Sequence, residues 1–184
     1  MPPSSKSASP KKVILRRSRG EILSGYLPLA GFVQNHAIDL LDLSGRVLSL
    51  PLHDIKLISY VRDFNLNDTT NPERLTRRTF LARPRTEGLW FRLTFTSGEL
   101  LEGLAPTDAS LLDDLVLDYG LSFAPPDIRS NTQRIFVPRT SIADLQLIAV
   151  ITSPSKKKPA TPTPESTLQQ DLFNAQLPPN TRPN

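Results

Sequence analysis

Cysteine is absent from this chain of 184 residues, which excludes disulfides, thiolate metal sites and a cysteine nucleophile. Histidine is scarce, with only His36 and His53, and no zinc-binding spacing or serine-hydrolase motif occurs. No apolar stretch reaches membrane-spanning length, and the N-terminus lacks the apolar core of a signal peptide. We therefore expect a cytoplasmic protein with no membrane contact, no catalytic residues, no metal and no cofactor.

Aromatic residues make up only 7% of the chain, and most of them lie in predicted strands. Few are left to stack on bases, so nucleic-acid binding by the folded part is not expected. The net charge of +4 points the same way, because residues 1–12 carry +3, residues 154–184 carry +2 and the segment between them carries −1. The basic character therefore belongs to the two ends.

Proline, abundant at 18 residues, is also concentrated at the ends, and this distribution divides the chain. Segments this poor in apolar residues do not bury enough surface to become ordered. We expect a disordered segment at 1–10, a first β unit at 11–61, an arginine-rich linker with a short helix at 62–88, a second β unit at 89–151, and a disordered proline-rich tail at 152–184 with a short linear motif at 168–177.

The two predicted β units resemble each other. Residues 13–25 read VILRRSRGEILSG and residues 91–103 read FRLTFTSGELLEG, with Leu, Gly, Glu and Gly at matching positions. Each unit also ends on an apolar segment, IKLISYV at 55–61 and LQLIAVI at 145–151. Repeated segments of this length indicate a duplicated structural unit. Because units of this size are marginal alone, we expect the copies to pack as a pseudo-symmetric pair.

Alternating apolar and polar residues predict strands within both units. Apolar side chains at 89, 91, 93 and 95 alternate with others, the period of a half-buried strand. We also predict strands at 13–17, 22–27, 36–43, 46–52, 55–61 and 100–104, and near 115–124, 134–138 and 143–151. Between the units, Asn71-Pro72-Glu73 is a helix-start signal, and it predicts a short helix through Thr79.

Five short strands, a Gly-Glu hairpin and a closing strand resemble a small SH3-like or Sm-like barrel. The fold class we predict is therefore mainly β, with two tandem barrels of this type. KVILRRSRGEILSG, SYVRDF, FTSGELLEG and PPDIRSNTQRIFVPRTSIADL resemble an uncharacterised bacterial family, of the type found in Acidobacteria, with two such units. The resemblance covers residues 11–151 and implies a fold, because that family has no assigned activity.

Two groups of arginines are candidate anion-binding sites. One lies in the polar segment 125–134 and comprises Arg129, Asn131, Gln133 and Arg134. The competing interpretation of this segment is a long hairpin loop whose side chains bond to backbone. The other group comprises Arg74, Arg77 and Arg78 in the linker. Its Arg-x-x-x-Arg spacing resembles the pair with which PilZ-type domains hold cyclic di-GMP, although the glycine of their companion motif is missing after Asp108-Ala109-Ser110. A solvated helical face is the alternative.

The tail carries the most function-specific pattern. Gln169-Gln170-Asp171-Leu172-Phe173 resembles the pentapeptide with which bacterial proteins bind the DNA polymerase sliding clamp. That resemblance implies a hydrogen bond from Gln169 at the pocket rim, a tolerated Asp171, and burial of Leu172 and Phe173, while Gln170 departs from the favoured leucine. The alternative is an amphipathic turn that docks on the protein itself or on another partner.

Taken together, these patterns predict a non-enzymatic binding or adaptor protein. A protein partner, with the sliding clamp as the hypothesis, would be recruited by the tail, by the barrel surface or by both. The alternative function is a sensor of a nucleotide such as cyclic di-GMP, or of RNA, that uses the arginine-rich linker.

Overall fold

The computed structural model describes residues 9–66, 77–107, 119–127 and 129–152. These residues form eleven β-strands and two short 3-10 helices. They belong to one compact unit, and residues 154–184 lie outside the described ranges. Within those ranges, no helix has the length and apolar character needed to cross a membrane. The prediction of a mainly β fold is therefore confirmed.

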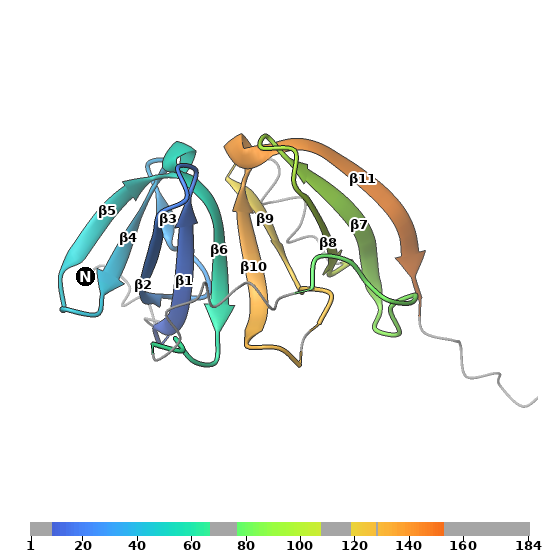
Figure 1. Ribbon diagram of the computed structural model, residues 1–184, viewed down its shortest axis with the longest axis horizontal. Coiled ribbons are helices and arrows are strands. Elements are labelled where there is room, and N and C mark those ends of the chain that lie inside the picture. Colours follow the sequence, from blue (N-terminus) through green and yellow to red (C-terminus); the bar gives the residue numbers. More distant parts are fainter. Residues whose placement is uncertain (1–8, 67–76, 108–118, 128, 153–184) are drawn as a thin grey trace, which may run out of the picture. The chain divides into compact units, whose positions relative to one another are not determined.

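The strands divide into two halves along the chain (Figure 1). The first half comprises β1 (Lys11–Arg17), β2 (Ile22–Leu27), β3 (Val33–Gln34), β4 (Ala37–Asp42), β5 (Val47–Pro51), η1 (Leu52–Asp54) and β6 (Ile55–Val61). The second half comprises β7 (Gly88–Phe95), β8 (Leu100–Ala105), β9 (Gly120–Phe123), β10 (Thr132–Pro138), η2 (Arg139–Ser141) and β11 (Ile142–Ile151).

Strand pairing follows the same order in both halves. In the first half β5 pairs with β4, and the order continues through β2 and β1 to β6. In the second half β10 pairs with β9, a bridge between Leu104 and Ala124 connects β9 to β8, and β7 and β11 follow. All of these pairings are antiparallel. In each half the last strand therefore lies beside the first. Contacts between residues far apart in the sequence determine this arrangement, since strands in chain order would place them at opposite edges.

The first turn of each half has the same geometry. The amide of Arg17 donates to the carbonyl of Glu21 at 2.8 Å, and that of Phe95 donates to the carbonyl of Glu99 at 2.8 Å. Gly20 and Gly98 lie at the end of these turns with φ of +93° and +81°. Backbone in this left-handed region favours glycine because other residues place a Cβ too close to the chain. The matching glycines in the sequence are thus required by matching turns.

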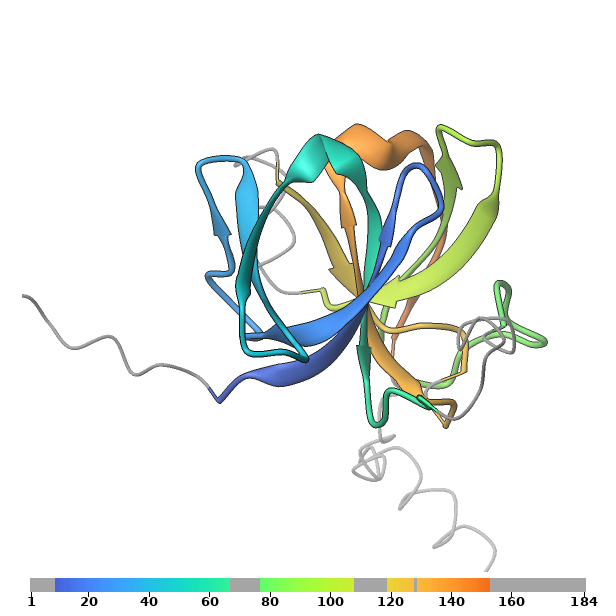
Figure 2. The same ribbon diagram turned by 60° about the vertical axis from the view of Figure 1, so that its left-hand side comes forward.

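A β-bulge and a 3-10 helix also recur at corresponding places. The pairing of β1 with β6 shifts register between Arg16 and Arg17, and the pairing of β7 with β11 shifts between Ile142 and Asp144. A single 3-10 turn precedes the last strand in each half, and η1 and η2 lie side by side (Figure 2). Because Arg17 pairs with Ile55 and Phe95 with Ile142, the counterpart of Ile55 is Ile142.

The two halves are joined through β6 and β10, which pair antiparallel and make one sheet of eight strands. Each half also contributes a side chain to the other. Phe136 of β10 lies in the core of the first half, and Leu57 of β6 lies in the core of the second. The hydroxyl of Ser141 donates to the carbonyl of Ile55 at 2.6 Å. Each half therefore keeps its own core but receives one side chain from the other half, and the two are joined by one hydrogen-bonded sheet.

The structure departs from the predicted architecture in two respects. The described sheets do not close into barrels: β8 and β9 meet only at one bridge, and β11 forms a separate sheet with β7 and β8. The predicted linker helix begins outside the described residues, and residues 77–79 are not helical, so no helix extends through Thr79. Arg78 instead runs beside strand β8, where its carbonyl accepts a hydrogen bond from the Glu102 amide.

Candidate functional site

The end of the linker, residues 77–87, is held against β8 by a buried glutamate. The amide of Glu102 donates to the carbonyl of Arg78 at 2.7 Å. The Glu102 carboxylate, only 4% exposed, accepts bonds from the Phe80 amide at 3.0 Å and from the Trp90 indole at 3.3 Å. The Arg92 guanidinium donates to the same carboxylate at 2.8 Å. Glu102 therefore fixes the path of a segment that has no secondary structure of its own.

The protonation of Glu102 follows from these contacts. Burial favours the neutral acid, but the bonds from the Phe80 amide, Arg92 and Trp90 outweigh burial and hold the pKa of Glu102 below its ordinary value. Hydrogen bonds to a charged acceptor stabilise its charged form, and those from a cation are the strongest of this kind. Glu102 is thus an ionised structural anchor.

Beside this anchor lies a groove of about 400 Å³, which we call the arginine groove. It is lined by Arg77, Phe80, Leu81, Ala82, Arg83, Pro84, Arg85, Thr86, Leu104, Ala124, Pro125 and Pro126. Its lining is mostly apolar, and Leu81 is 79% exposed. Two prolines come from the segment that follows β9, so the groove joins the linker to the second half of the molecule.

The three arginines of the groove are exposed. Among the described residues, neither an ion pair nor a side-chain hydrogen bond engages Arg77, Arg83 or Arg85. Each guanidinium offers five donors in a planar fork that fits carboxylate and phosphate groups. Three such groups among mostly apolar lining residues make a surface that is complementary to an anion with an apolar portion.

The neighbouring Arg78 is engaged differently. Its guanidinium pairs with the Glu99 carboxylate, which also pairs with the Lys56 ammonium at 2.5 Å. Lys56 comes from β6 of the first half and lies 5.1 Å from the ring centroid of Phe95. The bonds from Lys56 and Arg78 lower the pKa of Glu99 to about 2. This ionic cluster connects the halves and the linker, so Arg78 is a structural residue.

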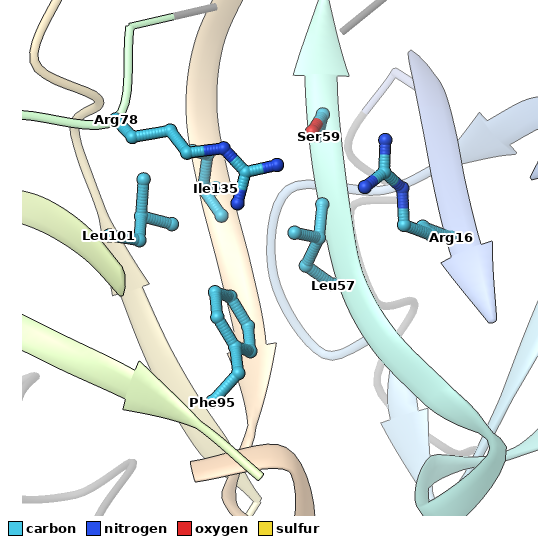
Figure 3. Close-up of a pocket in the computed structure, with 7 residues that line it drawn as sticks. All are labelled: Arg16, Leu57, Ser59, Arg78, Phe95, Leu101 and Ile135. Carbon is cyan, nitrogen blue, oxygen red and sulfur yellow. The ribbon is translucent and has the colours of Figure 1, made fainter. Parts of the chain in front are cut away.

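A second, smaller cavity lies where the halves meet (Figure 3). Its lining residues are Arg16, Leu57, Ser59, Arg78, Phe95, Leu101 and Ile135. Figure 3 shows the guanidinium groups of Arg16 and Arg78 on opposite sides of Ser59. The cavity measures about 40 Å³, room for on the order of three water molecules. It is too small for a nucleotide, so we place the candidate site in the arginine groove.

The predicted candidate residues of segment 125–134 take part mainly in loop structure. The Asn131 side chain accepts from the Asp63 amide at 2.9 Å and donates to the Asp63 carbonyl at 2.7 Å. The Arg129 amide donates to the Asp127 carboxylate at 3.1 Å. Gln133 is exposed, and Arg134 pairs through its backbone with Tyr60 on β6. These contacts favour the interpretation of a loop held by side-chain hydrogen bonds over that of an anion-binding site.

The remaining predicted residues are divided by the structure or lie beyond it. Of the linker arginines, Arg77 lines the groove, Arg78 joins the ionic cluster and Arg74 lies outside the described residues. The tail residues Gln169, Asp171, Leu172 and Phe173 also lie outside them. No group of three potential metal-ligating side chains occurs in the described ranges.

Sequence reasoning placed Arg83 and Arg85 in the arginine-rich linker but did not name them individually as candidate residues. The signal that favours them is the Arg-Pro-Arg run at 83–85, because proline restricts the chain to extended conformations that hold flanking side chains apart. The anchor Glu102 was also missed, since its place in an apolar strand gave no indication that its carboxylate would bind the linker.

Comparisons with known proteins give one finding. Neither a curated protein nor a solved structure matches the chain. A family model described as a family of unknown function, DUF6982, matches residues 9–149. This range contains the arginine groove and both halves except for the last two residues of β11. The chain belongs to DUF6982.

Proposed function

We propose that this protein is a non-enzymatic adaptor whose arginine groove binds an acidic, apolar peptide segment of a protein partner. The observation that carries the proposal is the set of three exposed arginines, Arg77, Arg83 and Arg85, around an apolar groove. Arginine is enriched in protein interfaces because its charge and its planar fork bind carboxylates in a defined geometry.

The size and lining of the groove support a peptide ligand. Its volume of about 400 Å³ lies within the range of ligand pockets, roughly 300–1,000 Å³. Leu104, Ala124, Pro125 and Pro126 offer apolar surface to a leucine or an aromatic side chain. The arginines at the rim would pair with aspartate or glutamate on either side of that side chain. Charge would then attract the segment, and apolar burial would hold it.

The scaffold of this adaptor is, in our proposal, a pair of tandem SH3-like or Sm-like units that arose as an internal repeat. Support comes from the common strand order, the common bulge and the 3-10 turn before each last strand. The matching first turns at Gly20 and Gly98 add to it. In such a scaffold the repeated strands supply stability, and the segments that differ between the copies supply the binding site.

Nucleotide or RNA binding at the same arginines is the second candidate, since guanidinium groups also fit phosphates. The scarcity of aromatic residues in the described lining of the groove argues against nucleotide or RNA binding. Phe80 is the aromatic residue among the described groove residues, and its ring packs against Trp90 with centroids 5.8 Å apart. Bases bound without strong sequence preference are held by several stacked aromatic rings.

The tail would supply a second contact, and the partner we propose for it is the bacterial sliding clamp. Support comes from the sequence Gln169-Gln170-Asp171-Leu172-Phe173. Two linked contacts raise overall affinity through effective concentration, so a groove and a tail that bind one assembly would reinforce each other.

The groove is tested by selecting binders to the full chain from a library of random peptides. We expect enriched peptides to carry Asp or Glu beside a large apolar residue. Their binding should fall by about tenfold or more in Arg77→Ala/Arg83→Ala/Arg85→Ala, from three exposed charge pairs of about 0.5–1 kcal/mol each. A matched control, Lys11→Ala/Arg19→Ala/Arg129→Ala, removes equal charge elsewhere and should bind like the unmodified chain.

Two results would refute the peptide proposal. One is a selection without acidic enrichment, and the other is binding that survives the triple groove variant. Calorimetry with cyclic di-GMP and with a mixed RNA pool distinguishes the second candidate. Heat that the groove variant abolishes and the control retains would assign the groove to nucleotides.

The tail is tested separately with a fluorescent peptide of residues 165–178 titrated with a bacterial sliding clamp. Saturable binding that is lost in the Leu172→Ala/Phe173→Ala peptide is the expected result. Equal binding by both peptides, or none by either, would remove the clamp as the partner. The groove proposal does not depend on this outcome.

A further inference from the structure

The last strands of the two halves occupy corresponding positions but differ in how they are covered. Ile58 on β6 pairs with Leu15, and Leu145 on β11 pairs with the corresponding Leu93. Ile58 is 0% exposed, whereas Leu145 is 41% exposed. One step further along, Tyr60 is 3% exposed and its counterpart Leu147 is 57% exposed. Two side chains of β11 are therefore exposed at positions where the corresponding side chains of β6 are buried.

The element that covers β6 is β10 of the other half. Phe136 pairs with Ile58, Ile135 with Ser59 and Arg134 with Tyr60 in an antiparallel ladder. The Phe136 side chain joins the core of the first half. In the described part of the chain β11 pairs only with β7. No described strand pairs with its other edge as β10 pairs with β6.

The strand that corresponds to β10 is β5 in the first half. The two pair in the same way with β9 and β4, with Pro138 opposite Gly120 and Pro51 opposite Ala37. Within the described residues β5 pairs only with β4, and its Val47 is 65% exposed. Among the described residues, β11 and β5 therefore each have one unpaired edge, and they correspond to β6 and β10, the two strands that pair at the junction of the halves.

We propose that copies of this chain associate head to tail, with β11 of one copy pairing antiparallel with β5 of the next. The internal β6–β10 pairing is the template for this contact, and it predicts the register. Leu145 would lie opposite Ser49 of the second copy, Gln146 opposite Leu48, and Leu147 opposite Val47. Leu147 and Val47 would then cover each other.

The second copy is the occupant that the structure favours because each molecule carries both complementary edges. Unpaired edge strands with apolar side chains are templates for pairing with another chain. A contact between two different surfaces of identical chains repeats, so it closes into a ring or continues as an open assembly. A contact between two β11 strands would instead stop at a dimer.

Sedimentation of the full-length chain over a range of concentrations tests the proposal. We expect the average mass to rise beyond that of two chains. Leu145→Lys/Leu147→Lys blocks one edge and Val47→Lys/Ser49→Lys blocks the other, so each variant alone should remain a single chain. Their equimolar mixture should form a dimer and nothing larger, because each variant retains the edge that the other has lost.

The matched control, Leu66→Lys/Leu100→Lys, alters two exposed leucines, 68% and 47% exposed, that belong to neither β5 nor β11. It should associate like the unmodified chain. Amide exchange on the unmodified chain gives an independent readout without any variant, since exchange in β5 and β11 should slow as concentration rises. A single chain at every concentration, undiminished association of the β5 variant, or exchange independent of concentration would each overturn the proposal.

Discussion

The two halves of the molecule share a strand order, a bulge and a pair of turns, yet the glutamate that follows the first turn has different ion-pair partners in each half. Glu21 follows the first turn and pairs with Arg17 at 2.8 Å within its own hairpin. Glu99, in the same place after the second turn, pairs with Lys56 of the other half and with Arg78 of the linker. The local structure is therefore the same in both halves, and the residues that surround each glutamate determine its ion pairs.

The segments between the strands differ more than the strands themselves. The first half goes from β2 to β4 through the short strand β3, whereas in the second half β8 is bordered by the arginine-rich segment and by Pro125 and Pro126. The groove is built where the halves differ. If the groove is the binding site we propose, it was added to one half without disturbing the other.

The largest expected effect breaks the comparison between β6 and β11. Ile58→Ala removes a side chain that is fully buried, and it should lower the free energy of unfolding by about 2–5 kcal/mol. Leu145→Ala, at the corresponding position, should cost about 1 kcal/mol or less in dilute solution because the side chain is already partly in water. Urea unfolding of both variants measures the difference. Equal losses would show that the two positions are not distinguished by burial.

The next effect concerns the second of the two matching glycines in each half. A Cβ at Gly25 would meet the carbonyl oxygen of Leu41, and a Cβ at Gly103 would meet the ring of Phe123. We expect Gly25→Ala to lower the free energy of unfolding by about 3 kcal/mol, and Gly103→Ala by less, since a side chain yields more readily than a backbone. Thermal unfolding ranks the two, and the reverse order would contradict the assigned contacts.

The smallest effect separates the two glutamates by pH. The pKa of Glu99 is lowered to about 2, so its contribution to stability is present above its ordinary pKa and is lost as pH falls toward 2. Glu99→Gln should therefore reduce the loss of stability between about pH 4.5 and 2. Glu21→Gln, which removes an exposed pair, is the control. An unchanged acid profile in Glu99→Gln would show that the ionised Glu99 carboxylate does not contribute to the stability of the fold.

Much of the strand content could be predicted from the sequence because its signals are local. The predicted strands at 55–61, 89–95 and 100–104 agree with β6, β7 and β8 to within one residue, and alternation and turn glycines indicate them. The short β3 has no such pattern. The similarity of residues 55–61 to 145–151 was misleading, because the pairing makes Ile142 the counterpart of Ile55 and shifts the match by three residues.

The arrangement of the halves and of the groove could not be predicted in this way. The β6–β10 pairing brings together residues more than 70 positions apart, and neither strand carries a feature that specifies its partner. The groove depends on Glu102, whose carboxylate positions Phe80 from 22 residues away. Long-range contacts of this kind are fixed by the whole core and by the satisfaction of buried polar groups. The abundance of arginine in the linker could be read from the sequence. The sequence did not indicate that Arg78 would join the ionic cluster while Arg77, Arg83 and Arg85 would line the groove.

Titration of one enriched acidic peptide against three forms of the full-length protein tests the central claim most directly. We predict saturable binding by the unmodified chain and by Lys11→Ala/Arg19→Ala/Arg129→Ala, weakening with added salt because exposed charge pairs are screened. We predict a loss of about tenfold or more in Arg77→Ala/Arg83→Ala/Arg85→Ala. Equal affinity in all three forms would contradict the assignment of the arginine groove as the binding site.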